Sequence, residues 1–183
     1  MDREELTYGA HKVIAGVLKG QCRAIVYRDE TQLKAVDADT VADAIAAAKD
    51  WIDALNRERS KGRRAPHIGT KADYIEAFRA TPIADHHAAM LRAHANAPER
   101  ALTAAELAKA AGYASFASAN SHYGKLARTI AESIGLSPAV RDGQDHEVWT
   151  FALADGDGEV ETASWRWIMH PEVRDALREL NMV

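Results

Sequence analysis

The stretch that decides the fold lies at residues 102–136, LTAAELAKAAGYASFASANSHYGKLARTIAESIGL. Thr103 and Glu106 have the spacing of a capping box, which predicts the start of a short helix, and Gly112 is placed to end it. A longer helix is predicted from about Phe116 to Ile134. Two helices joined by a glycine turn are the arrangement in which a helix-turn-helix presents its second helix to a DNA groove. The same arrangement also occurs in proteins that bind no DNA.

At 100° per residue, the longer helix divides into an apolar stripe and a polar arc. The stripe is expected to face the core and consists of Phe116, Ala119, Tyr123, Leu126, Ala127, Ile130 and Ile134. The polar arc is the candidate DNA-binding surface, because recognition helices contact bases with side chains near their N-termini. Its candidate contacts are Ser118, Ser121 and His122, facing bases or phosphates, and Lys125 and Arg128, neutralising phosphates. A solvated helix face without a ligand is the alternative.

Two residues lie on the shoulder between the stripe and the arc. Gly124 costs a helix about 1 kcal/mol relative to alanine, so we interpret it as a position where a neighbouring element approaches closely. Asn120 is interpreted as a structural hydrogen-bonding residue rather than as a base contact.

The pattern predicts an α+β protein that begins with a small unit at residues 1–57. This unit is expected to be an antiparallel β-sheet plus one helix, with strands near residues 11–17, 22–27 and 32–36. The helix is expected to start at Asp39 or Thr40 and to end near Arg57. Residues 58–69 are predicted to be a basic linker. We interpret it as a solvated hinge, and as an alternative its cations, Arg63 and Arg64 in particular, contact DNA phosphates.

Residues 70–183 are predicted to form a mostly helical winged helix-turn-helix domain. Helices are expected at about 72–80 and 83–95, ahead of the stretch quoted above. The aromatic-rich runs VWTFAL (148–153) and SWRWIM (164–169) alternate in character and are predicted to be the two strands of a hairpin, the wing. A closing helix is expected from Pro171 to about Leu180, with proline at the favoured first position.

One known family shares these features. LTAAELAKAAGY, the following AN-x-x-YGKLA (119–127) and the terminal WRWIMHPEVRDALREL resemble the winged-helix module that accompanies HNH-type, modification-dependent restriction nucleases. The resemblance covers about residues 72–183 and implies DNA recognition, with modified or foreign DNA as the implied target. The sequence contains neither an HNH constellation nor a convincing paired-acid-plus-lysine motif, so the nuclease activity is not carried over. We therefore expect a reader of DNA or a regulator that is not an enzyme.

The charge pattern argues against DNA binding by the whole surface. The net charge is −4, so a DNA-binding site must be a local patch. The predicted wing is acidic, because the stretch from Arg141 to Glu161 has one arginine and seven carboxylates, Asp142, Asp145, Glu147, Asp155, Asp157, Glu159 and Glu161. Because a wing that follows the phosphate backbone should be basic, this hairpin either points away from DNA or binds another partner. The alternative function is therefore a protein–protein interaction module, such as a phage or plasmid accessory protein, that uses the acidic hairpin and the aromatic strands.

Other classes of site have weaker support. Cys22 is the single cysteine, which excludes an internal disulfide and a multi-cysteine zinc site. His86, His87 and His94 share one predicted helix, but a metal ion there would need a carboxylate or another histidine from elsewhere, so we expect no metal and no cofactor. The chain has neither a signal-peptide pattern nor an apolar run long enough to span a membrane, and we expect a cytoplasmic protein. A homodimer would match a two-fold DNA site.

Overall fold

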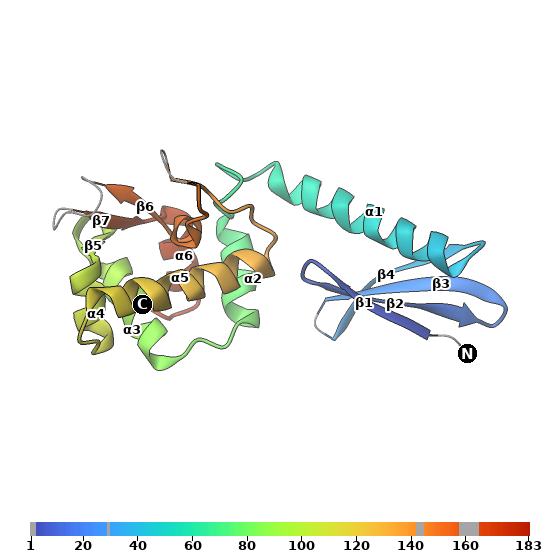
Figure 1. The fold of residues 1–183 in the computed structure, drawn as a ribbon, viewed down its shortest axis with the longest axis horizontal. Coiled ribbons are helices and arrows are strands. Elements are labelled where there is room, and N and C mark those ends of the chain that lie inside the picture. The colour runs from blue at the N-terminus through green and yellow to red at the C-terminus, as the bar shows by residue number, and fades with distance from the viewer. Residues whose placement is uncertain (1–2, 29, 142–144, 158–164) are drawn as a thin grey trace. The chain divides into compact units, whose positions relative to one another are not determined.

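The computed structural model describes residues 3–28, 30–141, 145–157 and 165–183 of the chain. It is a mixed α+β protein in which Met1–Lys61 and Gly62–Val183 form two compact units. Figure 1 shows a sheet with one helix in the first unit, and a group of helices with a small sheet in the second. Among the described residues, no helix combines the length and the apolar character needed to cross a membrane.

The first unit contains a four-stranded antiparallel sheet in which each strand pairs with the next along the chain. Its strands are β1 (Arg3–Tyr8), β2 (His11–Leu18), β3 (Gln21–Arg28) and β4 (Thr31–Ala38). The last three confirm the predicted strands, and β1 was not predicted. Helix α1 (Val41–Ser60) follows, and its N-terminus is capped by Thr40, whose hydroxyl accepts a hydrogen bond from the Asp43 backbone N–H.

The core of the first unit lies between one face of the sheet and α1. Alternate residues of β2 and β3 are buried, as the period of two along a strand requires, and Val13 pairs with Val26 while Ala15 pairs with Ala24. The same core contains Ala44, Ile45, Ala48 and Ile52 of α1. Because α1 continues to Ser60, the predicted helix end near Arg57 was too early. The first residues of the expected linker are therefore helical.

The second unit begins with helices α2 (Lys71–Ala80) and α3 (Asp85–Asn96). A short 3-10 turn, η1 (Pro98–Arg100), and a short strand, β5 (Ala101–Thr103), lead into the helices α4 (Ala104–Ala111) and α5 (Phe116–Ser133). The chain closes with η2 (Trp149–Ala152), β6 (Ala154–Asp157), β7 (Arg166–Met169) and α6 (Pro171–Glu179). These elements surround one apolar core, to which α5 contributes one side along most of its length.

The small sheet differs in part from the predicted hairpin. Its order is β5-β7-β6, and both pairs are antiparallel. Residues 149–152, predicted to be a strand, instead form the 3-10 turn η2, which contacts α5 and buries Thr150 and Ala152. The first strand of the hairpin is instead the following segment ADGD (β6), which pairs with β7, so the prediction of a hairpin holds while the position of its first strand was wrong. The connection was predicted at residues 155–163, but residues 155–157 belong to β6, and residues 158–163 lie outside the described residues.

Candidate nucleic-acid interface

The bounds of α4 and α5 lie within one residue of the predicted ones, and the predicted capping box and Gly112 stop of α4 are present. Thr103 and Glu106 form a reciprocal capping box at the start of α4, and Gly112 ends this helix in the left-handed conformation with φ 73°. Ser115 caps α5 by accepting a hydrogen bond from the Ser118 backbone N–H. Local sequence signals therefore set the short turn between α4 and α5.

The inner stripe of α5 is buried, with one exception. Its buried members are Ala119, Tyr123, Leu126, Ala127, Ile130 and Ile134. Phe116, the first residue of the helix, was predicted to face the core but is 62% exposed. The N-terminal turn of α5 therefore carries an aromatic side chain in solvent.

Three of the candidate DNA contacts lie on the solvent side of α5. Ser121, Lys125 and Arg128 are exposed. The Arg128 guanidinium donates a hydrogen bond to Glu132 Oε1 at 2.8 Å and lies 5.3 Å from the centre of the Trp149 ring. Arg128 thus already has an anionic and an aromatic neighbour, and a phosphate would have to compete with Glu132.

The other two candidates on α5 are partly covered. The Ser118 hydroxyl lies 3.0 Å from the Ser115 hydroxyl and belongs to the helix cap. His122 stacks on Tyr113, with ring centres 4.9 Å apart and an angle of 15° between the planes. Ser121 and Lys125 are therefore exposed predicted contacts that neither the helix cap nor a stacked ring covers.

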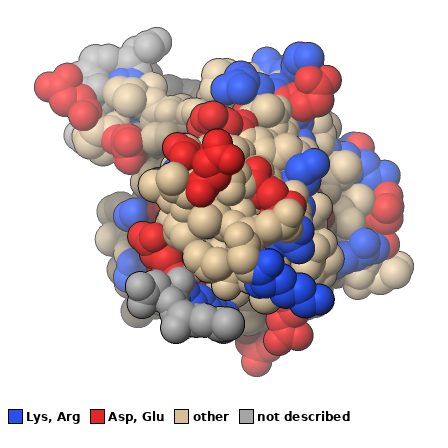
Figure 2. Space-filling model, turned by 90° about the vertical axis from the view of Figure 1, so that its right-hand side faces the viewer, with Lys and Arg blue, Asp and Glu red and all other residues tan. Residues whose placement is uncertain are grey.

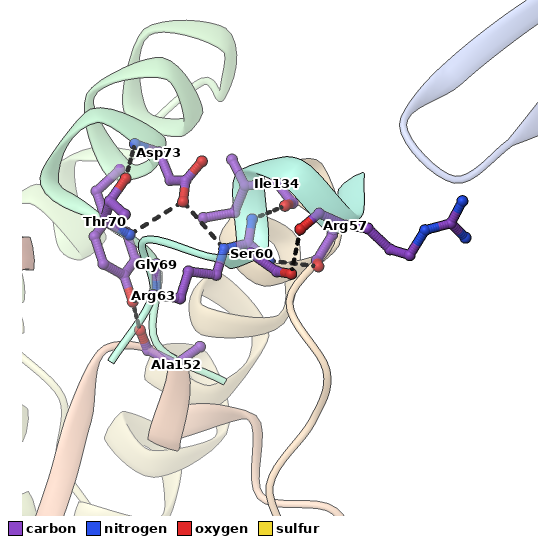
Figure 3. Close-up of polar contacts among 10 residues, drawn as sticks. Arg57, Ser60, Arg63, Gly69, Thr70, Asp73, Ile134 and Ala152 are labelled. Atoms are coloured by element: carbon purple, nitrogen blue, oxygen red, sulfur yellow. Dashed lines mark hydrogen bonds and ion pairs between the residues drawn. The ribbon is translucent and has the colours of Figure 1, made fainter. Parts of the chain in front are cut away.

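Arg63 does not belong to a solvated hinge. Its guanidinium donates to Asp73 Oδ2 at 3.1 Å, to the Ile134 carbonyl at 2.7 Å and to the Gly135 carbonyl at 3.0 Å (Figure 3). The side chains of Arg63 and Asp73 are only 6% and 5% exposed. Its prediction as a DNA contact is corrected here, because a buried cation that closes the C-terminal end of α5 is not available to a phosphate.

Arg64 is half exposed but is also held within the second unit. Its Nε donates to Glu172 Oε1 at 3.2 Å, and its Nη2 lies 3.2 Å from His170 Nδ1. Glu172 raises the pKa of Arg64, mainly through this hydrogen bond. The predicted basic arm is therefore replaced by two arginines that are fixed to the domain that follows them.

The shoulder residues pack α5 against the C-terminal elements. Asn120 Oδ1 accepts a hydrogen bond from the indole Nε1 of Trp167 at 3.4 Å, which agrees with its structural interpretation. A Cβ on Gly124 would lie 3.6 Å from Thr150 Oγ1, an ordinary contact distance. η2 therefore lies against α5 at this point, and the glycine is not required by a steric clash.

The three histidines of α3 are not brought together as a group. His94 is buried and makes two hydrogen bonds of 2.8 Å, one with the Tyr123 hydroxyl and one with the Trp167 carbonyl. Burial lowers its pKa to about 4, so the ring is neutral, with Nε2–H donating to the carbonyl and Nδ1 accepting from Tyr123. His94 is thus a structural residue that links α3, α5 and β7.

His86 and His87 instead meet a histidine from another helix. One ring nitrogen of each, and one of His122 on α5, all lie within 4.8 Å of one another, an arrangement that three metal ligands could adopt. The sequence identified the need for a histidine from elsewhere but gave no sign that His122 supplies it. His122 lies 35 residues beyond His87 on a different helix, so no local sequence pattern links the two histidines.

One described acid of the hairpin is paired with a cation: Asp157 forms an ion pair with Arg166 at 2.9 Å. Asp155 lies 3.5 Å from His170 Nδ1, but burial lowers the pKa of this histidine, which disfavours its charged form. In Figure 2, acidic and basic side chains both lie on the face that is drawn, which belongs largely to the first unit. Asp142, Glu159 and Glu161 lie outside the described residues.

The aromatic residues of the C-terminal elements are largely used inside the fold. Trp167 is buried, and the Arg141 guanidinium lies 4.5 Å from the centre of the Trp165 ring. The rings of Trp165 and Trp167 therefore make contacts within the fold, whereas the alternative hypothesis of a protein-interaction module requires them as contact surface.

Comparisons with known proteins return no match to this chain: no family model, no curated protein and no solved structure is similar to it.

Proposed function

We propose that this chain is a non-catalytic DNA-binding protein in which α4 and α5 act as a helix-turn-helix. In this proposal, the N-terminal turns of α5 enter the major groove of duplex DNA. The observation that carries the proposal is the exposed side of α5, which presents Phe116, Ser121, Lys125 and Arg128. The sequence from Phe116 to Arg128 contains no carboxylate, so the N-terminal three turns of this side can approach phosphates without charge repulsion, and Glu132 lies one turn beyond them.

The order of the elements supports a winged-helix arrangement. In that fold, a short strand lies between the first two of three helices, and a hairpin follows the third. Here β5 lies between α3 and α4, and β6 and β7 follow α5. The strand order β5-β7-β6 also agrees with that arrangement, with the β6–β7 hairpin as the wing.

Each residue on the exposed side of α5 has a distinct expected role. Lys125 is a mobile cation suited to a phosphate, and Arg128 reaches a phosphate by leaving Glu132. The Ser121 hydroxyl can donate to or accept from a base edge or a phosphate. The exposed ring of Phe116 suits an apolar contact with a methyl group on a pyrimidine base. A modified or foreign duplex remains the target class that the family resemblance implies.

The number of available cations sets the expected affinity for DNA and its dependence on salt. Two cations that neutralise two phosphates give a slope of about −2 for log K against log salt, so affinity should fall roughly tenfold between 50 and 200 mM salt. This electrostatic contribution is small, so we expect weak binding by a single copy and tighter binding where two copies occupy a two-fold site.

The test is duplex binding by fluorescence anisotropy at several salt concentrations, with unmodified and base-methylated duplexes. Lys125→Glu should weaken binding about tenfold or more and reduce the salt slope by about 1. Lys34→Glu is the matched control, because it makes the same charge change at an exposed position of β4 in the other unit. The proposal is refuted if the wild type binds none of these duplexes at low salt. It is also refuted if Lys125→Glu and Lys34→Glu have equal effects.

A further inference from the structure

Three imidazole rings from two helices converge beside α5. His86 and His87 occupy the first turn of α3, and His122 lies in the second turn of α5. The ring centres of His86 and His87 are 4.1 Å apart, and those of His86 and His122 are 5.1 Å apart. Tyr113 covers one side of the group, with its ring stacked on that of His122.

The state of His87 is the second observation that indicates a ligand. Its Nε2 is buried and has no hydrogen-bond partner among the described residues. Leaving a ring nitrogen buried and unpaired costs stability, so such atoms are uncommon without a ligand. The pKa of His87 is lowered, first by burial and then by the neighbouring His86 and His122. Metal ions bind the unprotonated nitrogen of a neutral imidazole.

We propose that His86, His87 and His122 form a binding site for one divalent transition-metal ion, with Zn²⁺ as the best fit. Neutral imidazole nitrogens suit zinc, nickel and copper, whereas calcium and magnesium require oxygen ligands. Three histidines leave a fourth coordination position open for water or another small ligand.

The required geometry is close to the one observed. Nitrogen ligands at 2.0–2.1 Å from a tetrahedral zinc ion lie roughly 3.3 Å from one another. The three ligand atoms already lie within 4.8 Å of one another, so small rotations of the side chains bring them to coordination distance. The positive end of the α3 dipole opposes a bound cation, and Asp85 in the first turn of α3 offsets this effect.

A bound ion would join α3 to α5 by a metal bridge. Binding to the native state alone stabilises that state in proportion to the logarithm of the metal concentration. This inference does not depend on DNA binding, since it rests on the side-chain geometry within the second unit. It does place a cation next to the exposed side of α5 on which Lys125 lies.

The experiment is a calorimetric titration of the full, tag-free chain with Zn²⁺ alone. Co²⁺ alone is the spectroscopic probe, because a site with three histidine nitrogens gives a visible absorption band on binding. We expect one metal ion per chain and a melting temperature that rises with Zn²⁺ concentration. His122→Ala should weaken Zn²⁺ binding at least about tenfold, since coordination by two adjacent histidines remains.

The matched control is His146→Ala, which removes an exposed histidine outside the cluster and should leave Zn²⁺ affinity unchanged. A second variant, His86→Ala, guards against local misfolding at His122, and circular dichroism checks the fold of both. The proposal is overturned if wild type binds no stoichiometric Zn²⁺ or Co²⁺. It is equally overturned if the folded His122→Ala and His86→Ala variants bind with wild-type affinity.

Discussion

Acidification should destabilise the second unit through His94. This ring is neutral in the native state, because burial lowers its pKa to about 4, compared with about 6.5 in an unfolded chain. The folded pKa lies below the unfolded one, so the unfolded state binds the proton first as the pH falls. The stability that the neutral ring contributes is therefore complete above about pH 6.5 and is lost progressively towards pH 4.

The magnitude follows from the two pKa values. A difference of about 2.5 units corresponds to about 3 kcal/mol in total, of which about 2 kcal/mol is lost between pH 7.5 and pH 5. The window above pH 5 isolates histidines, since the carboxylates with lowered pKa values, Asp37, Glu106 and Glu172, bind protons at lower pH. His67, His87 and His170 also have lowered pKa values and add losses of the same sign.

The assay is urea unfolding at pH 7.5, 6.5, 5.5 and 5.0 with a chelator present, and tryptophan fluorescence monitors the unfolding. Three of the four tryptophans, Trp149, Trp165 and Trp167, lie in the second unit and report on it. His94→Gln removes the titrating ring, so it should be less stable at pH 7.5 and should lose about 2 kcal/mol less on acidification than the wild type. Parallel stability profiles for the two proteins over this pH range would refute the reasoning.

Three substitutions test the packing within the second unit by chemical denaturation. Arg63→Ala should cost about 3 kcal/mol or more, because it leaves Asp73 buried without this cation; a loss below about 1 kcal/mol would contradict the buried ion pair. Gly124→Ala should stabilise the protein by up to about 1 kcal/mol, since the new methyl group meets an ordinary contact distance; a clear loss would show that the site is tighter than described. Gly156→Ala should lower the free energy of unfolding by about 1–3 kcal/mol, because the added Cβ would lie 1.9 Å from the Trp165 ring and the ring must move. An unchanged near-ultraviolet circular dichroism spectrum would show that the ring has not moved and would contradict this prediction.

The parts of the fold that sequence predicted are those coded by neighbouring residues. The capping box at Thr103 and the left-handed Gly112 act within one helical turn, so their signals are readable without tertiary information. The buried stripe of α5 was predicted for the same reason, since a period of 3.6 residues is a local property. Phe116 is the exception, because it precedes the part of the helix that the core covers.

The parts that sequence did not predict depend on distant partners. β1 begins Arg3-Glu4-Glu5, which gives no strand signal, and it becomes a strand by pairing with β2. Arg63 donates a hydrogen bond to the carbonyl of Ile134, 71 positions away. Because this partner is not visible in the local sequence, the basic run was interpreted as a hinge. The histidine cluster has the same cause, because α3 and α5 meet only in the folded domain.

Arg63 also determines where the chain can be divided. Its guanidinium occupies the carbonyl end of α5, where the helix carries its partial negative charge, so a residue just after the first unit completes a helix of the second. An exchange of N-terminal units, by recombination or by design, must therefore join the chain upstream of this arginine. A break just after it would separate α5 from the cation that completes its C-terminal end.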